Sequence, residues 1–103
     1  MSIYMMSTLE IKTGGVEKFS KAMSEMALPF LEKQGWRLNG AYMQTTGRLN
    51  TIIDLWELDD MNHYHRVLMM LMSEDFFPAF SAVLEETVLK ETIVFSVKAP
   101  FAR

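Results

Sequence analysis

Two strand-like runs on either side of a short turn constrain the fold of this chain more than any other feature. Residues 36–45 and 51–58 are rich in apolar and β-branched side chains, and Gly47-Arg48-Leu49-Asn50 lies between them. Glycine and asparagine favour tight turns, so this segment predicts a β-hairpin. A four-residue loop would place Met43 opposite Asp54 and Ala41 opposite Trp56.

The rest of the chain alternates strand and helix patterns around this hairpin. Residues 2–12 and 88–98 alternate apolar and polar side chains, which is typical of half-buried strands. Helical spacing of apolar residues predicts helices over 16–30, 61–71 and 76–84. Pro29 should kink or end the first of them. The order βαββαβ predicts an α+β, ferredoxin-like sandwich: a four-stranded antiparallel sheet with the helices on one face.

Composition limits the class of protein. The 103 residues predict a single domain, residues 1–103, and half of them are hydrophobic, which excludes disorder. The net charge is −3 without a basic cluster, so we expect no nucleic-acid partner. No apolar run approaches the ~20 residues of a membrane span, and no secretory signal pattern opens the chain. The chain has no cysteine and so no disulfide, and we expect a cytoplasmic protein. We expect no membrane partner.

The sheet face turned away from the helices is expected to be apolar. On the hairpin register above, we assign Tyr42 and its apolar neighbours in both strands to the helix side. The opposite face then carries Met5, Leu9, Ala41, Met43 and Trp56. A monomer rarely exposes so large an apolar patch. The sequence therefore predicts a homodimer whose two sheets pack into one α/β barrel.

Asp54 is the most suggestive candidate for chemistry. It lies in mid-strand between Ile53 and Leu55, on the same face as Trp56. A buried carboxylate is unfavourable unless it is paired or protonated. One interpretation makes Asp54 a general base, or a hydrogen-bond anchor for a ligand beside Trp56. The other makes it part of an ion pair with Arg37, Arg48 or a partner subunit.

The two histidines and two tyrosines complete the candidate site. His63 and His65 point about 200° apart on a helix, so they cannot share a metal, and we expect no metal site. His65 is a candidate acid or base, with an ordinary surface histidine as the alternative. Haem binding through either histidine is a further hypothesis. Tyr42 and Tyr64 are expected to face each other and, with Trp56, to line a cleft for an aromatic molecule; ordinary packing is the alternative.

The sequence also resembles the NIPSNAP family of dimeric α/β-barrel proteins. The similarity is carried by Ile3-Tyr4, Lys12-Thr13-Gly14, Gly35-Trp36-Arg37-Leu38-Asn39-Gly40-Ala41-Tyr42, Gly47-Arg48-Leu49-Asn50 and Ile53-Asp54-Leu55-Trp56-Glu57-Leu58. It implies the barrel and the dimer. The wider superfamily includes small monooxygenases, haem-degrading enzymes, stress-responsive barrel proteins and polyketide cyclases.

The chain departs from this family's pattern at four positions. Where the family's first strand typically carries Glu, Arg and Tyr, this chain has Met5, Ser7 and Leu9, and where the family has a His it has Asp54. The basic character of that surface is therefore lost. The resemblance implies a protein that binds a small apolar or aromatic molecule without a cofactor, as a monooxygenase or cyclase by analogy. The alternative is a non-catalytic dimeric interaction module.

Overall fold

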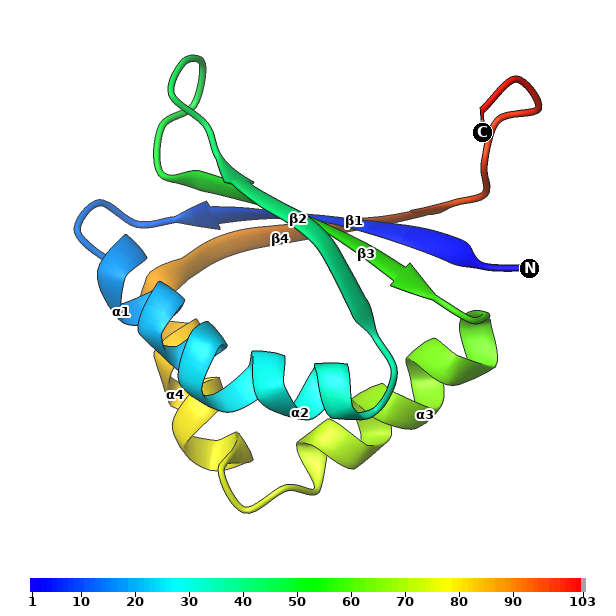
Figure 1. Ribbon diagram of the computed structural model, residues 1–103. Coiled ribbons are helices and arrows are strands. Elements are labelled where there is room, and N and C mark those ends of the chain that lie inside the picture. The colour runs from blue at the N-terminus through cyan, green and yellow to red at the C-terminus, as the bar shows by residue number, and fades with distance from the viewer. Residues whose placement is uncertain (103) are drawn as a thin grey trace.

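The computed structural model describes residues 1–102 as one four-stranded antiparallel sheet with all helices against one face (Figure 1). The strands are β1 (Ile3–Ile11), β2 (Arg37–Met43), β3 (Thr51–Leu58) and β4 (Val88–Ser96). The helical segments are α1 (Val16–Ala22), η1 (Met23–Ala27), α2 (Leu28–Lys33), α3 (Met61–Met72) and α4 (Phe77–Thr87). In space the strand order is β2-β3-β1-β4. This arrangement confirms the ferredoxin-like βαββαβ sandwich predicted from the sequence.

The first helical stretch continues from α1 through η1 to α2, and its middle turn is widened. η1 is a π-helical segment, and Pro29 follows it in the first turn of α2. The proline ring has no N–H and would collide with the carbonyl four residues before it. A π-helical turn relieves that conflict without ending the helix. Pro29 therefore disturbs the regular ladder, as predicted, but the helix continues to Lys33.

The hairpin between β2 and β3 has a different register from the predicted one. Ala41 pairs with Asp54, and an irregularity between Leu38 and Gly40 places Leu38 opposite Trp56. The predicted partners Met43–Asp54 and Ala41–Trp56 are therefore wrong. The connecting loop is longer than four residues, because the last interstrand hydrogen bond joins the Gln44 N–H to the Thr51 carbonyl over 2.9 Å. A longer loop moves every pair along the strands.

The two faces of the sheet are reversed relative to the sequence prediction. Met5, Leu9 and Trp56 face the helices and are buried. Tyr42 lies on the other face and is 61% exposed. The row Gly40, Leu55, Met6 and Val94 crosses that uncovered face from β2 to β4. The prediction failed because the hairpin face that carries Tyr42, Ile53 and Leu55 is nearly all apolar, so it was assigned to the helices, whereas the helices cover the other face.

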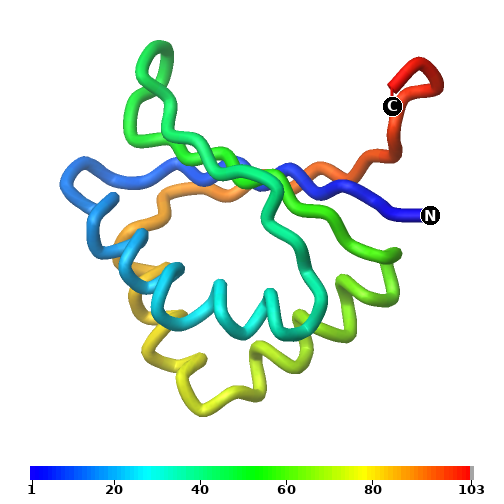
Figure 2. The backbone as a smooth tube through the Cα atoms, viewed as in Figure 1, coloured from blue at the N-terminus to red at the C-terminus, as the bar shows by residue number. Residues whose placement is uncertain are grey.

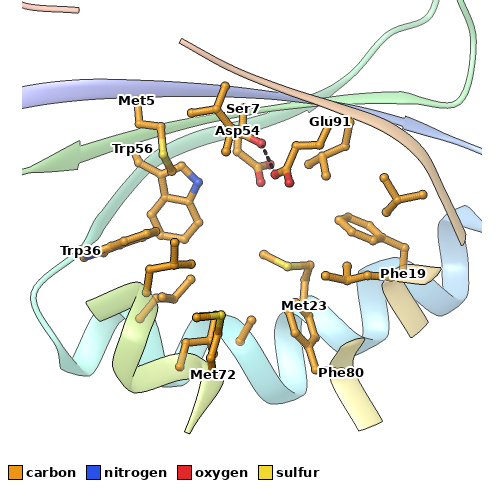
Figure 3. A pocket seen from close by; sticks show the side chains of 18 of the residues that line it. Met5, Ser7, Phe19, Met23, Trp36, Asp54, Trp56, Met72, Phe80 and Glu91 are labelled. Atoms are coloured by element: carbon orange, nitrogen blue, oxygen red, sulfur yellow. Dashed lines mark hydrogen bonds between the residues drawn. The ribbon is translucent and has the colours of Figure 1, made fainter. Parts of the chain in front are cut away.

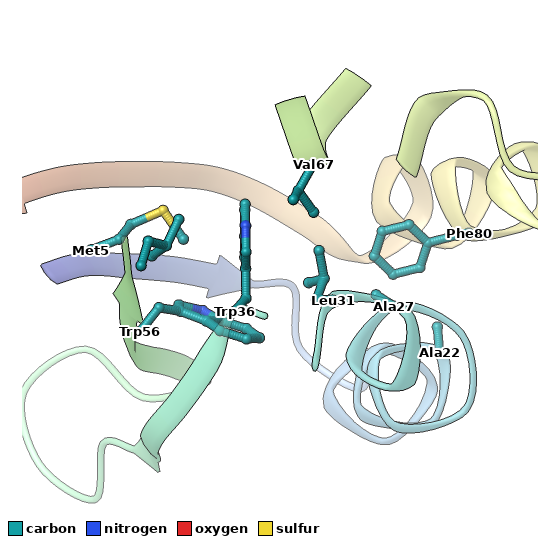
Figure 4. Close-up of a cluster of buried hydrophobic side chains, with 9 residues drawn as sticks. Met5, Ala22, Ala27, Leu31, Trp36, Trp56, Val67 and Phe80 are labelled. Atoms are coloured by element: carbon teal, nitrogen blue, oxygen red, sulfur yellow. The ribbon is translucent and has the colours of Figure 1, made fainter. Parts of the chain in front are cut away.

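The main hydrophobic core joins β1 and β3 to the helices, with contributions from α1, η1, α2, α3 and α4 (Figure 4). Trp36 and Trp56 meet edge to face with ring centroids 5.6 Å apart, and Trp36 stacks on Tyr64 at 5.6 Å. His63 ties the surrounding segments together. Its Nδ1 accepts a hydrogen bond from the Asp59 N–H at 3.0 Å, and its Nε2 lies 2.8 Å from the Gln34 carbonyl. Both ring nitrogens are therefore engaged, which fixes the junctions before β2 and α3.

Both ends of the sheet carry segments that rise on the side without helices. Figures 1 and 2 show the loop between β2 and β3 and the segment after β4 on that side. Apolar side chains on them are exposed, among them Leu49, Val97 and Phe101. Within residues 1–102, no single helix is long and apolar enough to cross a membrane; α3 and α4 meet that test only as a pair bent by 101°.

Candidate functional site

A cavity of about 600 Å³ lies between the sheet and the helices. Figure 3 shows side chains from β1, β3 and β4 above it and helical side chains below it. Most of its walls are apolar, with Met5, Phe19, Met23, Phe80, Trp36 and Trp56 among the lining residues. A volume of several hundred Å³ with mainly apolar walls and a few polar groups is typical of small-molecule sites.

The sheet places three polar side chains, Ser7, Asp54 and Glu91, on its side of this cavity, which we call the ceiling. Ser7 on β1 lies directly between Asp54 on β3 and Ile93 on β4, and Glu91 is two residues along β4. The Ser7 hydroxyl donates a hydrogen bond of 2.9 Å to Glu91 Oε2 (Figure 3). Because alternate residues of a strand share a face, Asp54 and Glu91 both belong to the helix side of the sheet. Two carboxylates therefore lie on the same side of a largely apolar cavity.

Asp54 is poised to exchange a proton near neutral pH. Only 7% of its surface is exposed. The pKa of Asp54 is raised from 3.8 to about 6. Burial is the main cause and the Glu91 carboxylate adds to it, whereas a hydrogen bond from Trp56 lowers the pKa. Burial disfavours the charged form of an acid, and a second negative charge acts in the same direction. A carboxyl group with a pKa near the working pH suits general acid–base chemistry.

No ion pair neutralises Asp54 within residues 1–102. Arg37 lies 3.4 Å from Glu57 and 3.5 Å from Asp59, and Arg48 pairs with Glu10 at 2.6 Å. The expected intrachain partners are thus engaged elsewhere, and the ion-pair interpretation with Arg37 or Arg48 is wrong. A subunit packed on the uncovered sheet face would meet the side of β3 opposite to Asp54.

An aromatic wall closes the end of the cavity next to Asp54. Trp56 and Tyr64 both line it, and Tyr64 also meets Phe95 edge to face at 4.9 Å. Burial raises the pKa of the Tyr64 phenol, and Glu91 adds to the effect. Tyr42 does not contribute. It lies on the uncovered face, so the expectation that Tyr42 and Tyr64 face each other is wrong.

The histidines lie outside the cavity. His65 is exposed, and its ring meets that of Tyr64 edge to face at a centroid distance of 5.2 Å. The buried positions of α3 are His63, Val67 and Leu71, so His65 fits the alternative of an ordinary surface histidine. His63 has both nitrogens hydrogen-bonded, which leaves none to bind haem iron. In the described chain, no three His, Cys, Asp or Glu side chains are grouped to hold a metal ion.

Comparison with known proteins identifies the family of this chain. The NIPSNAP family model matches residues 4–103. The chain belongs to the NIPSNAP family. An uncharacterised NIPSNAP domain protein from Burkholderia xenovorans is 27% identical over 98% of both chains, with a TM-score of 0.83. No curated protein matches the sequence.

More distant solved structures share the fold. A NIPSNAP family protein from Agrobacterium tumefaciens is 16% identical, covers 99% of this chain and 97% of its own, and superposes with a TM-score of 0.87. A putative antibiotic biosynthesis monooxygenase from Bacteroides thetaiotaomicron is 13% identical over 99% of this chain and 94% of its own, with a TM-score of 0.73. At these identities the similarity shows the fold alone.

Sequence reasoning found part of this site and missed two members. Asp54, Trp56 and Tyr64 line one cavity, whereas Tyr42 and His65 do not. Ser7 and Glu91 were not predicted as site residues. One signal was present, because all four positions where the chain departs from the NIPSNAP pattern, Met5, Ser7, Leu9 and Asp54, line the cavity.

Proposed function

We propose that this NIPSNAP protein binds a small, largely apolar or aromatic molecule in the cavity beneath the sheet and transfers a proton to or from it without a cofactor. The observation that carries the proposal is the buried Asp54 carboxyl on the sheet side of a largely apolar cavity. A filled core would place an apolar side chain there, since a buried carboxylate without a counter-charge destabilises the fold. A binding site accounts for both the empty volume and the carboxyl group.

The chemistry follows from the basicity of Asp54. Its carboxylate would accept a proton from an acidic C–H or O–H of the bound molecule, because burial, and after it the nearby Glu91 charge, raises its pKa and makes it a stronger base than an exposed aspartate. The resulting enolate or phenolate is the species that adds to a carbonyl in a cyclisation, or reacts with O₂ in a cofactor-independent oxygenation. Trp56 and Tyr64 would hold the flat body of the molecule.

Binding can be tested with a neutral apolar dye such as Nile red, whose emission increases in apolar surroundings. Saturable binding is expected for the native protein. Met23→Trp should abolish it, because Met23 projects into the cavity (Figure 3). Met69→Trp is the matched control, since Met69 is exposed on α3 and does not line this cavity. Native-like binding by Met23→Trp, in a variant that remains folded, would contradict the proposed site.

The uncovered sheet face supports a homodimer as part of the proposal. Its central row carries the exposed residues Met6, Leu55 and Val94. The segments that rise beside this face add exposed Leu49 and Phe101. A two-fold partner with the same surface would bury the apolar row of both sheets and receive both raised segments. The mass in solution, measured by light scattering, tests this directly.

This same face is the reason to keep a second candidate function, a non-catalytic dimeric interaction module. The two functions differ in which surface matters. Filling the cavity through Met23→Trp would leave an interaction module's function intact, whereas it would abolish a ligand-dependent one. A charge placed at Leu55, on the uncovered face, would have the reverse effect on partner binding.

A further inference from the structure

On its sheet side, the cavity offers hydrogen-bond acceptors and negative charge. Its acceptors there are the carboxylates of Asp54 and Glu91, and the neighbouring donors are already used. The Ser7 hydroxyl donates to Glu91, and Trp56 hydrogen-bonds to Asp54. A ligand group placed between the carboxylates therefore meets free acceptor oxygens and negative charge.

No basic side chain of residues 1–102 forms an ion pair with either carboxylate. Lys90 is the single basic residue among the cavity-lining ones in this part of the chain. It precedes Glu91 on β4 and pairs with Glu10 in the strand register, so it belongs to the opposite face of the sheet. Glu85, on α4, adds another acidic group to the lining.

We propose that the ligand of this cavity carries a cationic group, an ammonium on an apolar or aromatic body, which is bound between Asp54 and Glu91. The inference rests on the proposed binding role of the cavity and is independent of the proton transfer. An ammonium supplies the donors and the positive charge that the nine-tenths buried Asp54 lacks, and charge-assisted hydrogen bonds are the stronger ones. Trp56 also lines this cavity, and an indole ring is the aromatic side chain that attracts a cation most strongly.

The binding should depend on pH in a defined direction. The ionisable group facing Asp54 is Glu91 on β4, and Tyr64 on α3, Glu85 on α4 and Lys90 on β4 also line the cavity. The pKa of Asp54 is raised to about 6, so its carboxylate is charged above that pH and takes up a proton below it. Affinity for an ammonium therefore falls below pH 6, by at most about tenfold per pH unit from this one group.

Three ligands of one shape test the inference: 2-naphthylmethylamine, 2-naphthylmethanol and 2-naphthoate. Isothermal titration calorimetry at pH 7.5 is expected to show the amine binding about tenfold or more tightly than the alcohol, with the carboxylate weakest. The ratio of amine to alcohol affinity should fall towards one in Asp54→Asn and decrease in Glu91→Gln. Glu17→Gln, at an exposed position on α1, is the charge-matched control and should keep the native ratio.

The outcomes separate this inference from the proposed function. Equal affinity for amine and alcohol, or tightest binding of the carboxylate, would overturn the cationic assignment while the cavity remains a binding site. Failure of all three ligands and of the neutral dye would overturn both. Circular dichroism of each variant establishes that it is folded. A native affinity ratio in folded Asp54→Asn would also refute the assignment.

Discussion

Replacing Asp54 with asparagine should stabilise the protein at neutral pH. The side chain is buried and faces Glu91, and the pKa of its carboxyl group rises from 3.8 to about 6 on folding. That difference is about 2 pH units, and each unit corresponds to about 1.4 kcal/mol, so the charged carboxylate destabilises the folded state by about 3 kcal/mol. Asparagine keeps the shape and an oxygen acceptor for Trp56 but has no charge to bury.

The sign of the pH dependence follows from the raised pKa. Below about pH 4 the carboxyl group is protonated in both the folded and the unfolded chain, and the native protein and Asp54→Asn should differ little. Between about pH 4 and pH 6 the unfolded chain has lost this proton while the folded one retains it, so the native protein loses stability relative to the variant. Above about pH 7 the difference should be constant.

Urea denaturation at several pH values between 3.5 and 8, at one protein concentration, measures this difference in free energy of unfolding. Asp75→Asn is the matched control, because Asp75 is exposed in the turn between α3 and α4. Its effect should stay within about 0.5 kcal/mol. If Asp54→Asn is destabilising at pH 7.5, or its effect does not change with pH, Asp54 is compensated by a group that this reasoning omits.

Three further substitutions test the rest of the structure. Trp56→Ala should lower the free energy of unfolding by about 3–5 kcal/mol in urea titrations, since it removes a buried ring, whereas Met69→Ala at an exposed position should have little effect. His63→Ala should cost about 3 kcal/mol because it leaves two backbone groups without partners, and His65→Ala, on the exposed side of α3, should be nearly neutral; equal losses would refute the bridging role. Leu55→Lys should convert dimers to monomers in light scattering while Met69→Lys does not, and an unchanged mass in both would place the interface elsewhere.

Element order was predictable because the periodicity of each segment is strong. The strands 3–11 and 51–58 and the helices around 16–33 and 61–72 coincide with the patterns read from the sequence. Periodicity reports the type of an element from neighbouring residues alone, without any long-range information. Because periodicity carries no long-range information, it did not give the strand register of the hairpin, where a longer loop shifted every β2–β3 residue pair.

The orientation of the sheet could not be obtained in the same way. Both faces of β1 are apolar, with Met5 and Leu9 on one and Tyr4 and Met6 on the other. A pattern that is apolar on both sides does not specify which side meets the helices. In the hairpin, the nearly all-apolar face of Tyr42, Ile53 and Leu55 then favoured the wrong side.

Glu91 and Ser7 were missed for a related reason. Their hydrogen bond joins residues 84 positions apart in the sequence, and it exists only because β1 and β4 are neighbours in the sheet. A glutamate in an edge strand is ordinarily a solvated residue. Only the register places Glu91 on the same face as Asp54, so no local signal could have associated the two carboxylates.

Asp54, the charged residue on the helix-facing side of the sheet centre, is also the residue that points to function. In sequences that specify a fold, each residue suits its local environment, and exceptions such as a buried charge occur mainly at functional sites. Asp54 is such an exception in two ways, since it is a charged residue on the buried face and has a second carboxylate beside it. An apolar side chain in its place would remove the buried charge and fill part of the cavity, and both changes would stabilise the fold. A structural role therefore accounts poorly for Asp54, whereas a ligand that enters the cavity and meets its carboxylate accounts for the charge and the empty volume together.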